Sequence, residues 1–112
     1  MEFNNKKGLD CPINYTLSIV QGKWKWAILW LIYQSEVIRY GKLKEKLQFI
    51  AHKTLSQQLK ELENSELIHR EQYNVIPPKV EYTLTEKGKA VIPILELLSQ
   101  WGSKYKQSGP NS

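Results

Sequence analysis

Only one cysteine, Cys11, occurs among the 112 residues. A lone thiol excludes an internal disulfide, and sparse cysteine is typical of proteins kept in reducing compartments. The longest unbroken apolar run, residues 26–33, has eight residues, whereas a membrane helix needs about 20. The sequence also lacks the basic start and small-residue exit of a cleavable signal peptide. We therefore expect a soluble cytoplasmic protein with no membrane segment.

Patterns that carry catalysis or metal binding are missing as well. Cys11 lies far along the chain from His52 and His69, so no zinc-ligand spacing is present. The segment GKWKW lacks the glycines and the terminal Ser or Thr of a phosphate-binding loop. No nucleophile has a plausible base beside it, and no two carboxylates are placed for acid–base chemistry. We expect neither an enzyme nor a bound metal or cofactor.

Acidic residues are scarce in one segment, and the net positive charge of the protein is concentrated there. Residues 39–60 contain a single acid, Glu45, and account for the whole net charge of +5. The basic residues of this segment are Arg39, Lys42, Lys44, Lys46, Lys53 and Lys60. Concentrated positive charge is typical of a phosphate-binding surface, although a lysine-rich solvated face gives the same tally.

Apolar spacing and turn residues divide the first half of the chain into helices. A first helix is expected to begin within residues 10–12, with a proline in its first turn, and to stop at Gly22. A second helix, over residues 23–34, is apolar on most sides and is expected to be buried. A short strand at 37–40 and a small helix at 42–47 follow. The tryptophans expected in the core are Trp24, Trp26 and Trp30.

The segment KTLSQQLKELENSELIHR, residues 53–70, raises the main question of function. It is expected to be helical, apart from a strand-like run that begins at residue 68. On a helical wheel one face carries Leu55, Leu59 and Leu62. The opposite face carries Lys53, Ser56, Gln57 and Lys60. Amides, hydroxyls and lysines can bind phosphates and read base edges, so this face is expected to enter a major groove.

The remaining chain completes a recognisable order of elements. Strand-like runs at 68–73 and 80–84 are joined by a loop, residues 74–79, which contains two prolines and Lys79. Thr85 is expected to cap a last helix, over about residues 86–105, which Pro93 should bend or leave with one turn unpaired. Helix, turn, helix and then a β-hairpin is the winged helix-turn-helix order. The expected fold is thus α+β, mainly α, in a single domain over residues 1–112.

Four quoted segments resemble the HxlR-type bacterial transcriptional regulators. They are CPINYTLSIVQGKWKWAILWLI, RYGKLKEKL, HKTLSQQLKELE and PPKVEYTLTEKG, and the likeness runs from about Cys11 to Gly102. The resemblance implies a homodimeric DNA-binding protein that represses or activates nearby genes. By that likeness HKTLSQQLKELE is the recognition helix, Lys79 is the basic residue of the wing, and Cys11 is a cysteine that senses oxidants or electrophiles in some members. Ala51 departs from the family pattern, since many relatives have a capping Ser or Thr there.

Three groups of site residues follow from these considerations. The residues expected to contact double-stranded DNA are Arg39, Lys42, Lys44, His52, Lys53, Thr54, Ser56, Gln57, Lys60 and Lys79. The residues expected in a dimer interface are Ile13, Leu17, Ile94, Leu98, Trp101 and Tyr105. Cys11 is the candidate redox sensor, with a buried structural thiol as the alternative. An oxidant or a small molecule is the expected effector.

Two functions remain open at this point. The first is a sequence-specific DNA-binding regulator, and the second is a winged helix that serves as a protein-interaction module. A protein interface would place aromatic or aliphatic anchors where Lys53, Ser56 and Gln57 stand, so we favour the regulator. Residues 1–9 and 106–112 are expected to be flexible.

Overall fold

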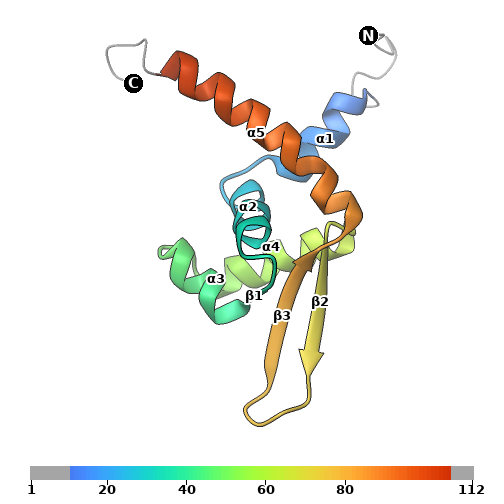
Figure 1. The fold of residues 1–112 in the computed structure, drawn as a ribbon, viewed down its shortest axis with the longest axis vertical. Helices are drawn as coiled ribbons and strands as arrows, with labels where there is room; N and C mark the ends of the chain where they lie inside the picture. The colour runs from blue at the N-terminus through green and yellow to red at the C-terminus, as the bar shows by residue number, and fades with distance from the viewer. Residues whose placement is uncertain (1–10, 107–112) are drawn as a thin grey trace.

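The computed structural model describes residues 11–106. The N-terminal and C-terminal helices project from one end of the body, and a β-hairpin projects from the other (Figure 1). In chain order the elements are α1 (Pro12–Val20), α2 (Lys25–Ser35), β1 (Ile38–Arg39), α3 (Tyr40–Leu47), α4 (His52–Asn64), β2 (Ile68–Tyr73), β3 (Lys79–Leu84) and α5 (Glu86–Lys106). The expected winged helix-turn-helix order is confirmed. The termini expected to be flexible fall outside the described residues, except that Lys106 ends α5.

Helix α2 lies at the centre of the fold. Its residues Ile28, Leu29 and Ile32 are fully buried, as expected for a helix that is apolar on most sides. Trp24 and Trp30 pack partly buried against this core. Trp26, however, is 48% exposed, so its predicted place in the core is wrong. A helix that is apolar all round does not reveal from its sequence which side faces its neighbours.

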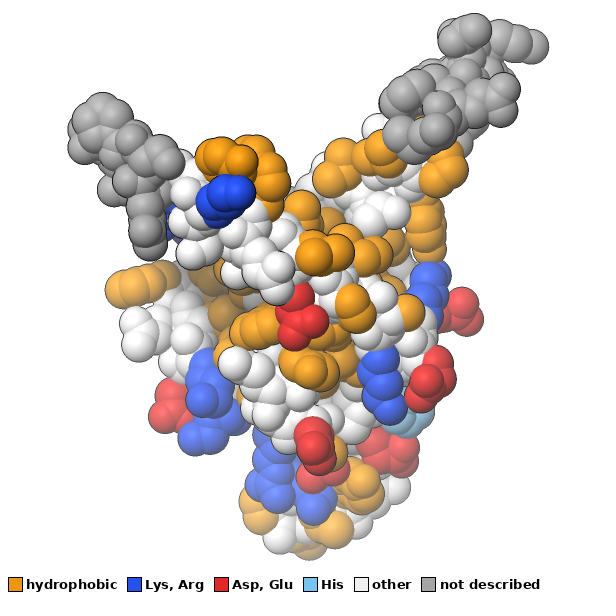
Figure 2. All heavy atoms as spheres, turned by 45° about the horizontal axis from the view of Figure 1, so that its top comes forward, with side chains coloured by type: hydrophobic (Ala, Val, Ile, Leu, Met, Phe, Trp, Pro, Cys, Tyr) orange, Lys and Arg blue, Asp and Glu red, His pale blue; other side chains and the backbone are white. Residues whose placement is uncertain are grey.

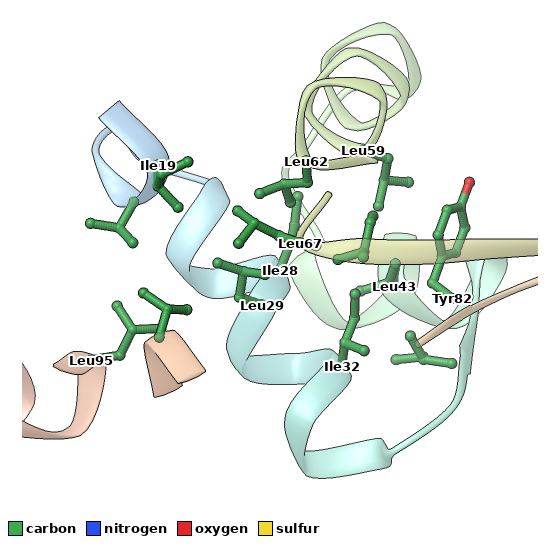
Figure 3. Close-up of a cluster of buried hydrophobic side chains, with 14 of the residues drawn as sticks. Ile19, Ile28, Leu29, Ile32, Leu43, Leu59, Leu62, Leu67, Tyr82 and Leu95 are labelled. Atoms are coloured by element: carbon green, nitrogen blue, oxygen red, sulfur yellow. The ribbon is translucent and has the colours of Figure 1, made fainter. Parts of the chain in front are cut away.

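Helices on either side of α2 supply much of the remaining core (Figure 3), and the strands add residues such as Tyr82. The three leucines predicted on one face of α4, Leu55, Leu59 and Leu62, are all buried. Leu95 of α5 contributes from the opposite side of α2. This packing fixes α4 with its leucine face inward, so the opposite face is left to solvent.

The sheet is antiparallel and has the strand order β1-β3-β2. The β2–β3 hairpin pairs Ile68 with Leu84 at its base and Tyr73 with Lys79 at its far end. Lys79 was expected in the loop and is instead the first residue of β3. Its partner Tyr73 extends the ladder by one step, which shortens the loop to residues 74–78.

Helix α4 ends earlier than the sequence suggests, at Asn64. Glu66 adopts the left-handed backbone region with φ of 63°. The N–H of Leu67 bonds to the carbonyl of Leu62, and the N–H of Glu66 bonds to that of Glu63. This is the Schellman arrangement that commonly ends helices, usually with glycine at the left-handed residue. Because glutamate occupies that place here, no sequence signal marked the helix end.

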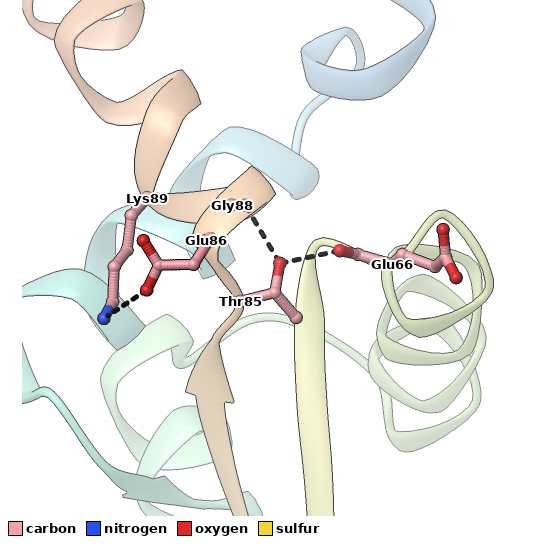
Figure 4. Close-up of polar contacts among 5 residues, drawn as sticks. All are labelled: Glu66, Thr85, Glu86, Gly88 and Lys89. Atoms are coloured by element: carbon pink, nitrogen blue, oxygen red, sulfur yellow. Dashed lines mark hydrogen bonds and ion pairs between the residues drawn. The ribbon is translucent and has the colours of Figure 1, made fainter.

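Helix α5 begins against this same turn (Figure 4). The Thr85 hydroxyl donates to the carbonyl of Glu66 at 2.7 Å and accepts the N–H of Gly88 at 3.0 Å. The N–H of Thr85 bonds to the carbonyl of Leu67. The predicted cap is confirmed, and it also ties α5 to the end of α4. Pro93 lies inside α5 without ending the helix.

Gly88 should be required by this joint. A Cβ at Gly88 would overlap the carbonyl oxygen of Leu67, which is backbone and cannot turn aside. We expect Gly88→Ala to lower the free energy of unfolding by roughly 2–3 kcal/mol, the upper range for overpacking. Gly41→Ala, at a helical site where an added Cβ would meet no atom within 4 Å apart from the adjoining helix backbone, should instead be neutral or stabilise by about 0.4–1 kcal/mol. Urea unfolding at one fixed protein concentration tests both, and equal stabilities would contradict the assignment.

Candidate nucleic-acid interface

The outward face of α4 carries the polar side chains that the sequence placed there. Lys53, Ser56, Gln57 and Lys60 are exposed, on the side of α4 opposite its buried leucines. No acidic residue lies in the first turn of this helix. Its N-terminus therefore presents free N–H groups together with cationic and hydrogen-bonding side chains.

The start of α4 is held by a residue that sequence reasoning missed. Ala51 is the N-cap residue and makes no side-chain capping bond. Tyr40, the first residue of α3, places its hydroxyl 3.0 Å from Nδ1 of His52 and 3.3 Å from Oγ of Ser56. Its ring lies parallel to the His52 ring, with centroids 5.8 Å apart and planes 10° apart. Tyr40 thus fixes both side chains from the preceding helix.

The carboxylate that accepts a hydrogen bond from Gln57 also forms an ion pair within the protein. Glu61 lies 2.9 Å from Nζ of Lys25 on α2. The hydrogen bond and the positive charge of Lys25 lower the pKa of the Glu61 carboxyl below its ordinary value. Gln57 donates a long hydrogen bond of 3.4 Å to the same carboxylate. The negative charge of Glu61 is therefore balanced by Lys25, which reduces its repulsion of a nearby phosphate.

Folding brings an acid to the basic residues outside α4. Glu81 of β3 lies 4.0 Å from Nε of Arg39 and 3.8 Å from Nζ of Lys79. Lys79 also lies over the ring of Tyr73, at 4.7 Å from its centroid. Lys42 pairs with Glu45 at 3.1 Å. Exposed pairs of this kind are weak, so phosphates can compete for these cations.

A groove of about 490 Å³ separates α4 from the hairpin. Its lining residues are Tyr40, Ser56, Leu59, Lys60, Glu63, Arg70, Val80 and Tyr82. Arg70 was not among the predicted DNA contacts; it is exposed and donates to Gln72 at 3.1 Å. Burial raises the pKa of the Tyr82 phenol, against the opposing hydrogen bond from Arg70. Arg70 lies on β2 opposite Tyr82. Because it is outside residues 39–60, the count of basic residues in that segment did not include it.

The predicted DNA contacts thus divide by accessibility. Thr54 and Lys44 are partly buried, and Lys79 has a side chain that is 32% exposed. The exposed residues are Arg39, Lys42, His52, Lys53, Ser56, Gln57 and Lys60. They come from the start of α3, from α4 and from the β1 strand beside them.

A second surface lies on the two projecting helices. Apolar side chains gather on both projecting helices, α1 and α5 (Figure 2). The predicted interface residues are all exposed in the single chain: Ile13 43%, Leu17 46%, Ile94 41%, Leu98 55%, Trp101 67% and Tyr105 50%. Beside them, α2 and α5 frame an apolar groove of about 440 Å³ that contains Trp26, Trp30 and Leu98. Single exposed apolar residues are common, but a continuous set marks an interaction surface.

Cys11 lies at the start of α1. It is the N-cap residue, makes no side-chain capping bond and is 4% exposed. Asp10, the other expected cap, falls outside the described residues. Within residues 11–106 no group of three or more His, Cys, Asp or Glu side chains could hold a metal ion. No helix in that part of the chain is long and apolar enough to cross a membrane.

The family model described as HxlR-like helix-turn-helix matches residues 19–110. The chain belongs to this family. It is therefore a transcriptional regulator of HxlR type, and its family consists of regulators rather than enzymes. A helix-turn-helix regulator family also implies DNA as the partner.

Relatives and solved structures agree with the HxlR assignment. The HTH-type transcriptional regulator BH0655 of Halalkalibacterium halodurans is 50% identical over 99 residues, which cover 88% of each chain. The redox regulator HypR in its reduced form superposes with a TM-score of 0.80 at 35% identity, covering 85% of this chain and 93% of HypR. The reduced transcriptional regulator YodB from Bacillus subtilis superposes with a TM-score of 0.78 at 30% identity, covering 88% and 97%.

Proposed function

We propose that this HxlR-type regulator binds a pseudo-palindromic operator as a homodimer, with α4 of each copy in a major groove. The observation that carries the proposal is the outward face of α4, which is polar, cationic and held rigid from behind by three buried leucines. Glutamine, serine and lysine are side chains that read base edges in a major groove. The β2–β3 hairpin, which faces α4 across the protein groove, would then act as the wing and lie along the sugar-phosphate backbone of the DNA.

The same face argues against a protein-interaction module. Protein interfaces draw their affinity from aromatic and aliphatic anchors that enter pockets. The four side chains predicted to enter the groove offer no such anchor; they are two lysines, a serine and a glutamine, and the exposed His52 beside them is polar. Many exposed apolar side chains lie instead on α1 and α5 (Figures 1 and 2). Phe49, which precedes α4, and Ile76, in the hairpin loop, are also exposed.

The apolar surface of α1 and α5 supports the homodimer. Val91 and Leu95 already supply the side of α5 that faces the monomer core. A second apolar side, with Trp101 67% exposed, needs another partner. Pairing by a two-fold axis would place the two α4 helices about 34 Å apart, or a multiple of it, to match successive major grooves on one side of a duplex.

Selection of genomic fragments tests the regulator directly. Purified protein is mixed with sheared genomic DNA of its source at near-physiological salt, and the retained fragments are sequenced. Enrichment of a few sites with inverted repeats is expected. Retention of all fragments alike would overturn sequence-specific binding and favour the interaction module.

Base-reading and phosphate-binding residues should separate by mutation. Gln57→Ala or Ser56→Ala should each cost on the order of 1–3 kcal/mol on the best site and little on random DNA. Lys42→Ala, Lys44→Ala or Lys79→Ala should weaken both alike and reduce the salt dependence, because each removes a phosphate contact. Fluorescence anisotropy across a salt series measures both quantities. The assigned roles fail if Gln57→Ala keeps the wild-type ratio of specific to random binding.

The dimer should depend on the apolar side of α5. Trp101→Glu places a charge in the proposed interface and should weaken association by on the order of 2 kcal/mol or more. Val37→Glu is the matched control, since Val37 is also exposed, at 48%, but lies before β1. Sedimentation velocity at micromolar concentration gives the masses. A monomeric wild type, with or without DNA, contradicts the dimer.

We also propose that Cys11 makes the regulator responsive to oxidants. Support comes from HypR, which is a redox regulator, and from the position of Cys11 at the start of α1, one of the two helices proposed to pair in the dimer. The chain offers no second thiol, so Cys11 would pair with Cys11 of the other copy or with a small thiol. In the first case two thiols lose two protons and two electrons to the oxidant.

Cys11→Ser separates the sensing and structural roles. Wild type should lose or gain operator affinity several-fold after diamide, whereas Cys11→Ser should be indifferent to it. Reducing conditions are the control, under which the two proteins should bind alike because Ser and Cys are of similar size. Non-reducing electrophoresis reports a bridge between copies. Unchanged binding by wild type after diamide would leave Cys11 a small buried side chain.

A further inference from the structure

Tyr40 joins His52 and Ser56 into one chain of hydrogen bonds on the α4 surface. The Tyr40 hydroxyl lies 3.0 Å from Nδ1 of His52, and 3.3 Å both from the carbonyl oxygen of His52 and from Oγ of Ser56. A phenol has a single proton to donate and can accept from others. The three partners therefore cannot all receive that proton, and its destination decides what the neighbours present to solvent.

The geometry favours one destination. The His52 carbonyl belongs to the first turn of α4, where the helix ladder supplies it with the N–H of residue 56. Nδ1 of a neutral His52 is the nearest partner and has no other donor from the helix. The Tyr40 proton is best used there, and the Ser56 hydroxyl then donates to the Tyr40 oxygen. The resulting order is Ser56 to Tyr40 to His52.

This order fixes the polarity of two exposed side chains. With Nδ1 accepting, the neutral imidazole carries its proton on Nε2 and becomes a donor toward solvent. Because the Ser56 hydroxyl donates its proton to Tyr40, only its lone pairs remain available. Ser56 can therefore only accept a hydrogen bond from a partner outside the protein. A serine is ordinarily ambiguous, because its hydroxyl rotates to donate or to accept.

We infer that Tyr40 is a positioning residue that makes Ser56 an acceptor and His52 a donor at the DNA surface, and so selects a base with an exposed amino group opposite Ser56. In the major groove those groups are N6 of adenine and N4 of cytosine. His52 would then serve an acceptor, such as a phosphate oxygen or guanine N7. The inference deepens the proposed function and rests on α4 entering the groove.

The chain provides a variant that removes the proton and keeps the ring. Tyr40→Phe retains an aromatic ring to stack on His52 but releases Ser56 to donate or accept. Tyr33→Phe is the matched control, because Tyr33 is an exposed tyrosine of α2 whose ring contacts Trp30 and not α4.

The hydrogen-bond order can be read without DNA. Nitrogen-15 spectra of histidine-labelled protein at pH about 8, where an imidazole in water is neutral, report which ring nitrogen carries the proton. We expect the proton of His52 on Nε2 in wild type, with the Nδ1 resonance moving to that of an unbonded acceptor in Tyr40→Phe. His69, whose Nε2 lies 3.0 Å from Glu71, is the internal reference and should not move. A proton on Nδ1 of wild-type His52 would overturn the inference.

Base preference tests the consequence. Affinities for operators substituted at each position should show that Tyr40→Phe loses about 5-fold discrimination at one base pair per half-site. Random-DNA affinity and salt slope should stay at the wild-type values, as should every property of Tyr33→Phe. Ser56→Ala should lose preference at the same base pair, and the double variant should lose no more than Ser56→Ala alone.

The outcomes separate the inference from the proposed function. If wild type discriminates among sites and Tyr40→Phe keeps every base preference, the role of Tyr40 is overturned while sequence-specific binding stands. If wild type discriminates among no sites, the proposed function fails and the base-selecting role of Tyr40 fails with it. In that case the spectra still decide the direction of the hydrogen bonds.

Discussion

The joint between the end of α4 and the start of α5 fixes how these two helices are oriented relative to each other, and the rest of the structure depends on that orientation. There the Thr85 hydroxyl bridges the Glu66 carbonyl and the Gly88 N–H, and Gly88 lies against the carbonyl of Leu67 with no room for a side chain. A third bond runs from Nζ of Lys87 to the carbonyl of Ser65 at 2.8 Å. Each of these contacts ends on a backbone group, and the N–H of Thr85 bonds directly to the carbonyl of Leu67, so α4 and α5 meet at one rigid corner.

That corner connects the two surfaces on which the proposed function depends. The side chains proposed to read bases lie on α4, and the apolar residues proposed for the dimer lie on α5 and α1. A rigid corner converts the way in which two α5 helices pair into a fixed distance between two α4 helices. A modest shift at α1, where Cys11 lies, would then alter operator fit without unfolding either copy. Regulation would need no contact between the sensing residue and the DNA.

Local patterns predicted the parts of the fold that depend on local physics. The leucine spacing of α4, the bounds of β2 and the Thr85 cap were all confirmed. The helix ends were harder, because Glu36, Gln48 and Glu66 take positive φ without being glycine. The N–H groups of Gln48 and Glu66 bond back to carbonyls of the helix that each ends, in a conformation that non-glycine side chains do not favour.

The residues of the candidate site were proposed from the sequence, and their connections to one another come only from the structure. Tyr40 and Arg70 act from another helix and from a strand, and such pairings have no signature in the spacing of residues along a chain. Glu81 shows the same limit, because the tally placed all net charge within residues 39–60 while folding sets this acid beside Arg39 and Lys79. The basic cluster is thus partly compensated before DNA arrives. In the proposed complex its lysines would supply affinity that salt can screen. Discrimination would then rest on the uncharged groups of α4, Ser56 and Gln57, and on the inferred role of Tyr40 in setting the polarity of Ser56.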